Sequence, residues 1–130
     1  MTTTAPSSGI AITQIGQIAI NVHDTNRALE FYRDTLGLKL LFTAGHLAFF
    51  DCGGVRLMLD GPAKAQAGSG SVIYYKVPDL QAAFTALSAR GLAFETPPHR
   101  IAKMPDHELW MAFFRDPDGN LLALMSEVKP

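Results

Sequence analysis

The chain has little cysteine, little net charge and no long apolar run, and each of these shortages excludes a class of protein. Cys52 is the only cysteine among 130 residues, so one chain cannot form an internal disulfide, which fits a reducing cytoplasm. The formal net charge is -1, so the sequence offers no basic surface for nucleic acid. No apolar run approaches the length of a membrane span. We therefore expect a cytoplasmic protein that binds neither nucleic acid nor a membrane.

What the chain does contain is one pattern written twice. The segment Ile18–Asp24 is matched by the segment Ile73–Asp79, and in both an apolar strand leads to an aspartate that can cap a helix. The helical stretch that follows ends at Gly37 in the first half and at Gly91 in the second. Each half therefore begins as the same supersecondary unit.

The repeat divides the chain into two modules and two connecting segments. Residues 14–60 form the first module and residues 71–128 the second, each expected to run strand, helix, strand, strand, strand. Residues 61–70, rich in Gly, Ala and Ser, form the expected linker, and residues 1–13 a disordered lead-in. After the second helix, strands are expected near residues 92–96, 100–103, 108–115 and 120–126.

A tight turn with the sequence Asp-Pro-Asp-Gly-Asn, residues 116–120, precedes the last strand. A tandem unit with this turn resembles the vicinal oxygen chelate superfamily, which includes glyoxalase I, extradiol dioxygenases and bleomycin-resistance proteins. The resemblance covers residues 14–128 and extends to three shorter motifs: Val22-x-Asp24, Phe31-Tyr32 and Leu36-Gly37-Leu38. It implies an α+β fold in which tandem βαβββ modules form a curved mixed sheet with an open cup, often completed in a homodimer. It implies no single reaction, because the fold serves many chemistries.

In metal-dependent members of the superfamily, four side chains on the floor of the cup bind one divalent ion. Carried onto this sequence, those positions fall at Gln17, Met58, Val72 and Ala123. Divalent ions prefer carboxylate oxygen or imidazole nitrogen, and only the Gln17 amide is a usable donor here. A shift of one residue would place leucines at the two last-strand positions. The resemblance therefore implies that this chain lacks the family's metal centre and binds no cofactor.

Ionisable residues elsewhere leave an alternative open. His46 begins the third strand of the first module, and His107 and Glu108 lie at the expected mouth of the cup. Convergence of two or more of His46, His107, Glu108 and Gln17 would favour relocated ligands for a divalent metal ion, or an acid–base pair. Without such convergence, each histidine binds only water and backbone groups.

Strand alternation predicts which residues line the cup. The residues expected to face it are Leu109, Met111, Phe113 and Ala123 from the second module, with Ala48, Met58 and, if it points inward, His46 from the first. Arg56 shares the parity of Met58, so it either offers a charge to an anionic ligand or lies along the edge. Methionine and aromatic side chains suit an apolar or planar ligand, but they also build packed cores.

The sequence favours a metal-free protein of the bleomycin-resistance type, which binds or sequesters an apolar or aromatic small molecule as a homodimer. Bleomycin itself fits poorly, because it is cationic and the chain is nearly neutral. The alternative is a glyoxalase-like lyase, isomerase or dioxygenase with relocated metal ligands or a His/Glu pair. A third possibility is an interaction module with its cup packed shut.

Overall fold

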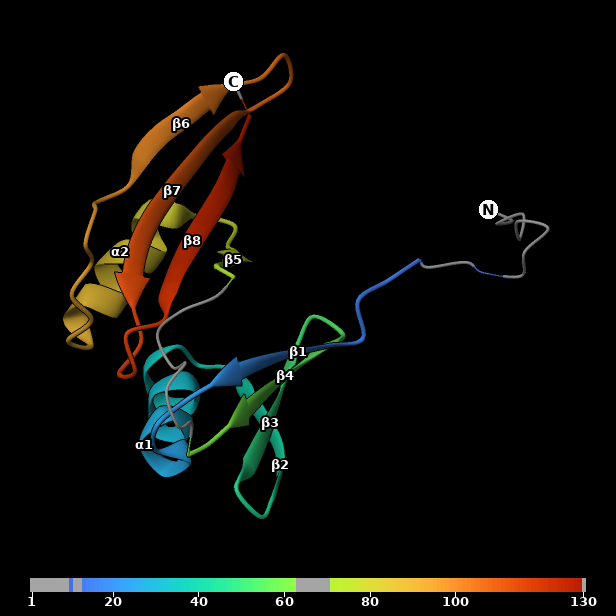
Figure 1. Cartoon of the computed structure of the whole chain (residues 1–130). Coiled ribbons are helices and arrows are strands. Elements are labelled where there is room, and N and C mark those ends of the chain that lie inside the picture. The colour runs from blue at the N-terminus through green and yellow to red at the C-terminus, as the bar shows by residue number, and fades with distance from the viewer. Residues whose placement is uncertain (1–9, 11–12, 63–70, 130) are drawn as a thin grey trace.

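Each half of the chain folds into a four-stranded mixed sheet with a helix on one face (Figure 1). A computed structural model describes residues 10, 13–62 and 71–129. The expected α+β fold with tandem βαβββ modules is confirmed by this arrangement. The predicted lead-in and linker lie mostly outside the described residues.

The first module places its first strand beside its last. Its elements are β1 (Gln17–Asn21), α1 (Thr25–Glu30), the π-helical turn η1 (Phe31–Thr35), β2 (Lys39–Ala44), β3 (Leu47–Cys52) and β4 (Val55–Asp60). The strand order is β1-β4-β3-β2, and β1 runs parallel to β4. Asp24 caps α1 as expected, because its carboxylate accepts a hydrogen bond from the Arg27 N–H at 3.2 Å.

The second module repeats this topology. Its elements are β5 (Ile73–Lys76), α2 (Leu80–Ala89), β6 (His99–Lys103), β7 (Glu108–Arg115) and β8 (Leu121–Val128), in the sheet order β5-β8-β7-β6. Asp79 caps α2 by accepting the N–H of Ala82 at 3.0 Å. No helix in the described part of the chain is long and apolar enough to cross a membrane.

The prediction of a strand near residues 92–96 is wrong. Phe94 forms only an isolated bridge with Phe114, and the N–H groups of Glu95 and Thr96 both donate to the Phe113 carbonyl oxygen. The segment therefore meets β7 at one point instead of running along it, and Pro97 follows directly without an N–H to extend the pairing.

One hydrophobic core fills the space between the helices and the helix-facing sides of both sheets. Its largest fully buried side chains are those of Tyr32, Phe50, Phe114, Leu59 and Leu122, which come from both modules. Because strand residues alternate between the faces of a sheet, the intervening residues of β3, β4, β7 and β8 point to the opposite, helix-free faces.

The carboxylate of Asp116 joins the second module to the first. Its Oδ1 accepts the backbone N–H groups of Asp118 at 2.9 Å and Asn120 at 2.8 Å, which closes the turn between β7 and β8. Its Oδ2 accepts the Asn120 amide and the Tyr32 hydroxyl, each at 2.8 Å. Tyr32 belongs to η1 and is fully buried, so this buried bond fixes the turn against the helix of the other module.

A second carboxylate of the same turn also reaches the first module. The side chain of Asp118 is fully buried, and its Oδ1 accepts the His23 backbone N–H at 2.6 Å and pairs with Arg27 at 3.0 Å. The Asp-Pro-Asp-Gly-Asn motif therefore contacts the beginning of α1, where Figure 1 shows the β7–β8 turn reaching the helix. The motif is a module–module contact, not a part of the helix-free faces.

Two buried tyrosines at this interface allow a matched test of the Asp116 bond. Tyr75 is also a tyrosine with a buried hydroxyl, but this hydroxyl has no hydrogen-bond partner among the described residues. Burial raises the pKa of both phenols, so both hydroxyls are protonated at neutral pH. We expect Tyr32→Phe to lower the free energy of unfolding by about 1 to 3 kcal/mol, since it removes the hydroxyl that bonds a buried carboxylate.

The same change at the other position should have no such cost. Tyr75→Phe removes a hydroxyl that gains no bond on folding, so the free energy of unfolding should stay the same or rise. Urea denaturation followed by circular dichroism measures both variants. Equal losses of stability in the two variants would contradict the role given to the bond between Tyr32 and Asp116.

Candidate functional site

The helix-free face of the first sheet carries an apolar row across all four strands. Strand pairing places Ala19, Met58, Phe49 and Phe42 side by side on β1, β4, β3 and β2. The rings of Phe42 and Phe49 stack with their centroids 4.5 Å apart. Phe42 remains 46% exposed, so an aromatic surface on this face is accessible to a ligand or to another protein chain.

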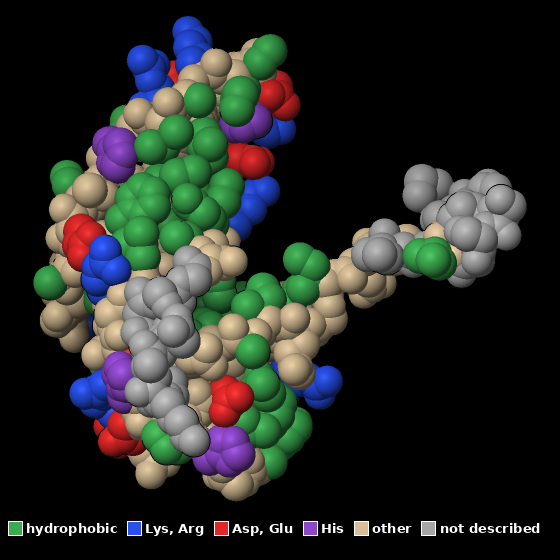
Figure 2. Space-filling view, viewed as in Figure 1, with side chains coloured by type: hydrophobic (Ala, Val, Ile, Leu, Met, Phe, Trp, Pro, Cys, Tyr) green, Lys and Arg blue, Asp and Glu red, His purple; other side chains and the backbone are tan. Residues whose placement is uncertain are grey.

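The helix-free face of the second sheet is apolar over a wider area, and Figure 2 shows hydrophobic side chains gathered over this sheet. One row consists of Tyr74, Ala123 and Phe113, in which the tyrosine ring meets the Phe113 ring edge-on at 6.0 Å. The next row consists of Lys76, Met125, Met111 and His99. Leu109 follows in the same alternation, opposite Glu127 and Ala102. We call these two surfaces the open faces of the sheets.

The four positions implied for a metal ion lie on these open faces, at equivalent places in the repeat. Met58 lies beside Ala19 in the first sheet as Ala123 lies beside Tyr74 in the second. Gln17 begins β1, and Val72 immediately precedes β5. The Gln17 amide donates to the Met58 sulfur at 3.8 Å.

The residues present do not fit a divalent metal ion. The only amide oxygen in the set, Gln17 Oε1, already accepts a hydrogen bond from Arg56 Nε at 3.0 Å. The guanidinium is a permanent positive charge, so it opposes a cation bound to the same oxygen. Across residues 10, 13–62 and 71–129, no three His, Cys, Asp or Glu side chains lie close enough to hold a metal ion elsewhere.

Two of the candidate site residues, one expected to face the cup and one expected at its mouth, lie on the helix side. Ala48 is fully buried in the core, opposite Leu59. Its neighbour Phe49, which pairs with Met58, points to the helix-free face instead. Glu108 accepts the Trp110 indole N–H at 3.1 Å and pairs with Arg100 at 3.5 Å. The prediction that Ala48 faces the cup is therefore wrong, whereas the predicted inward position of Leu109 already implies that Glu108 points to the helix side.

The ionisable candidates do not converge. His46 lies in the turn between β2 and β3, where its Nε2 is 3.3 Å from Asp60 Oδ1 and its side chain is 65% exposed. His107 Nδ1 lies 2.8 Å from Asp106 Oδ1 near the far end of the second sheet. Within the described part of the chain, no hydrogen bond or ion pair joins any two of His46, His107, Glu108 and Gln17.

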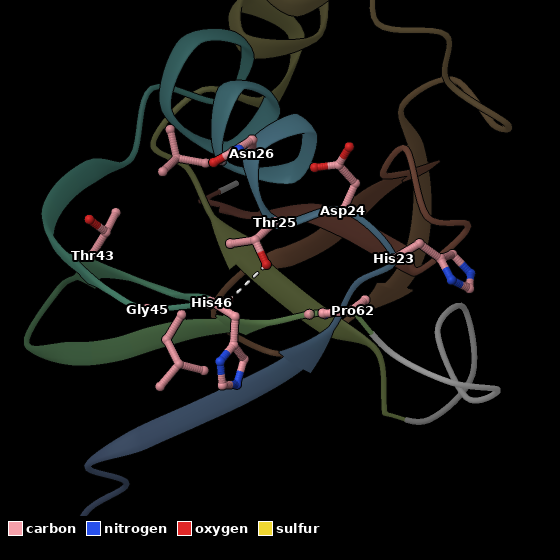
Figure 3. Close-up of a pocket in the computed structure, with 11 residues that line it drawn as sticks. His23, Asp24, Thr25, Asn26, Thr43, Gly45, His46 and Pro62 are labelled. Atoms are coloured by element: carbon pink, nitrogen blue, oxygen red, sulfur yellow. Dashed lines mark hydrogen bonds between the residues drawn. The ribbon is translucent and has the colours of Figure 1, made fainter.

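A hollow of about 420 Å³, with mixed polar and apolar lining, lies between the start of α1 and the β2–β3 turn. The Thr25 hydroxyl donates to the His46 carbonyl oxygen at 2.8 Å, and Figure 3 shows the His46 ring beyond this bond. In the same view the His23 ring points away from the other labelled side chains. Beside this hollow the His46 ring therefore pairs with Asp60, and none of the other ionisable candidates in the described part of the chain bonds to it.

The single thiol is unsuited to nucleophilic chemistry. Cys52 borders a second hollow, of about 340 Å³, between the end of η1 and α2, together with Tyr75. Burial and, to a smaller extent, the Asp51 carboxylate raise the pKa of the Cys52 thiol. The protonated thiol is favoured, so the reactive thiolate is disfavoured.

Sequence reasoning missed the aromatic row of the first sheet. Phe49 could have been found from Met58, since the two residues are direct partners in the hairpin of β3 and β4. Phe42 could not, because the pairing of β2 with β3 shifts by one residue between Leu40 and Phe42. Such a bulge changes the side to which every later residue of the strand points.

Comparison with known proteins agrees with this architecture. Residues 14–124 match the family described as Glyoxalase/Bleomycin resistance protein/Dioxygenase superfamily. The uncharacterized protein YraH of Bacillus subtilis is 29% identical over 126 residues, covering 83% of this chain and 94% of that protein. Among solved structures, a lactoylglutathione lyase from Agrobacterium tumefaciens is 25% identical with a TM-score of 0.74, covering 89% of this chain and 95% of the lyase.

A glyoxalase/bleomycin resistance protein/dioxygenase from Nocardioides is similar to the same degree. It is 26% identical with a TM-score of 0.71, and the match covers 93% of this chain and 89% of the Nocardioides protein. The family match spans both modules, and the fold matches along nearly the whole length of each structure. The chain therefore belongs to the Glyoxalase/Bleomycin resistance protein/Dioxygenase superfamily.

Proposed function

We propose that the protein binds a small apolar or aromatic molecule on its open faces, without a metal ion. The observation that carries this proposal is the occupation of the four metal positions by an Arg-bound amide, a thioether and two aliphatic side chains. Two of these positions, Met58 and Ala123, lie within rows that contain aromatic side chains. Methionine adapts to apolar ligands, and aromatic rings stack on planar ones. The chemistry of the floor therefore suits burial of apolar surface better than coordination.

These residues support ligand binding better than they support catalysis of a reaction. The Agrobacterium protein is named a lactoylglutathione lyase, but we do not extend that activity to this chain. General acid–base catalysis needs a titratable group within hydrogen-bond reach of the substrate proton. His46 and His107 each pair with a neighbouring carboxylate at separate sites, and Glu108 is engaged on the helix side.

We further propose that a second copy of the chain completes the binding site. A single chain leaves large apolar side chains exposed on its open faces, including Phe42 at 46% and Tyr74 at 45%. Wide exposed apolar surfaces are uncommon on monomers and mark sites of association or ligand binding. A homodimer in which the open faces meet would enclose the ligand between apolar walls.

Ligand binding should be independent of divalent metal. N-phenyl-1-naphthylamine, an uncharged aromatic dye, should bind with the same affinity in EDTA as in Mn, Fe, Ni or Zn, because the metal positions offer no adequate donor set. Fluorescence titration measures the affinity, and thermal unfolding with each ion provides a second readout. We expect none of the four ions to raise the melting temperature.

Two variants separate adventitious metal from a relocated metal site. Near-stoichiometric metal in the purified protein, lost in His46→Ala or His107→Ala, would establish the enzyme with relocated ligands and overturn the proposal. Failure of the dye to bind under any of these conditions would also overturn it.

The association state follows from the exposed apolar surface. Sedimentation equilibrium should give twice the chain mass of 14.1 kDa at micromolar concentration. Phe42→Asp should shift the population toward the monomer, because it places a charge on the open face, whereas Asp34→Asn on the exposed surface of η1 should not. A wild-type protein that sediments as a monomer at all concentrations would contradict the homodimer.

A further inference from the structure

We propose that Arg56 anchors a negatively charged group, so that the ligand of the first sheet is an aromatic or apolar monoanion such as a carboxylate. This inference rests on the proposed ligand site and specifies the class of ligand that it takes. It depends on how the guanidinium is held, on its lack of an ion pair with any described carboxylate, and on the apolar row that adjoins it.

The Arg56 guanidinium is oriented by two contacts that leave most of its donors uncommitted. Its Nε donates to Gln17 Oε1 at 3.0 Å, and its Cζ lies over the Phe49 ring, 5.7 Å from the centroid. These contacts use one of its five N–H groups. Neither Nη1 nor Nη2 has a hydrogen-bond partner among the described residues, so both can bind an oxyanion at once.

No protein carboxylate neutralises this charge in the described part of the chain. Four other arginines, Arg27, Arg33, Arg100 and Arg115, each have a carboxylate oxygen within 4.0 Å. Arg90 donates to the backbone carbonyl of Thr35 instead. Arg56 is the exception on an open sheet face, since no Asp or Glu of the described residues lies within ion-pair distance of it.

The nearest acidic residue in the strand register serves the turn. Asp51 is the direct partner of Arg56 across β3 and β4, but its carboxylate accepts the Gly54 backbone N–H at 3.3 Å. Lys39, the next residue across in β2, adds a second cation to the same row and forms no ion pair with a described residue. The row from β1 to β2 therefore reads Gln17, Arg56, Asp51 and Lys39, with more positive than negative charge.

The charged row borders the aromatic row of the same face. Phe49 packs under the guanidinium and stacks on Phe42, which is half exposed. A ligand with a flat apolar body on Phe42 and Met58 would place an attached oxyanion at the arginine fork. An arginine in a partly apolar setting binds planar oxyanions by two parallel hydrogen bonds, which gives both affinity and orientation.

Two dyes of matched shape test the charge directly. 8-Anilino-1-naphthalenesulfonate carries a sulfonate on the ring system of N-phenyl-1-naphthylamine, which has no charge. We expect Arg56→Gln to weaken binding of the sulfonate about tenfold or more, the usual order for a lost charge-assisted hydrogen bond, and that of the uncharged dye less than twofold. Arg56→Lys keeps the charge but not the fork, so its loss of sulfonate affinity should be smaller.

The matched control is Arg33→Gln, which removes an exposed arginine paired with Asp34 away from the open faces and should leave both dyes unaffected. Equal loss of both dyes in Arg56→Gln, with unchanged circular dichroism, would show that Arg56 only shapes the surface, and would overturn the anion site while leaving the proposed function standing. Wild-type protein that binds the uncharged dye but not the sulfonate would overturn it as well, as expected if an acidic side chain of a second copy occupies the fork. Failure of both dyes to bind the wild type would overturn the proposed function itself.

Discussion

The buried carboxylate of Asp116 is the contact on which the rest of the arrangement depends. With four hydrogen bonds it closes the turn before β8 and holds that turn to Tyr32 in the other module. The buried carboxylate of Asp118 also pairs with the half-exposed Arg27 and accepts the backbone N–H of His23. Because these bonds join the helix sides of the modules, the helix-free faces of both sheets are left open. The turn that identifies the family in sequence thus acts by placing the modules, at a distance from the site.

The two modules share one topology but differ in the side chains on their open faces. Met58 and Ala123 occupy equivalent positions in the two sheets, and neither offers the oxygen or nitrogen donor that a hard or borderline divalent metal ion prefers. In the first sheet the position of Gln17 has become part of a polar pair with Arg56. In the second sheet the neighbouring rows contain Tyr74, Phe113, Met111 and Met125. The polar members of these rows lie on the outer strands, where Lys76 pairs with Glu127 and the His99 ring contacts the Pro97 carbonyl oxygen. We infer a division of roles, in which one sheet supplies a charge and the other an apolar wall.

Most of the fold could be predicted from the sequence, because it rests on local signals. The caps Asp24 and Asp79, the glycine at the end of each helical stretch and the period of the strands all depend on neighbours along the chain. The faces of Ala48 and Phe42 could not be assigned in the same way. They depend on hairpin register and on a bulge in β2, and a shift of one residue reverses a side chain. The contact of Arg56 with Gln17 joins strands 39 residues apart, which no local pattern reveals.

The protein's own methionines provide the most direct test of an apolar, metal-free binding surface. Of its five methionines, Met58, Met111 and Met125 lie on the open faces, while Met104 lies in the turn between β6 and β7. Proton–carbon correlation spectra of methyl-labelled methionine, recorded in EDTA during titration with N-phenyl-1-naphthylamine, report on each site separately. The account predicts saturable shifts of the Met58, Met111 and Met125 signals and little change at Met104. Shifts confined to Met104, or no saturable shift at any methionine, would contradict it.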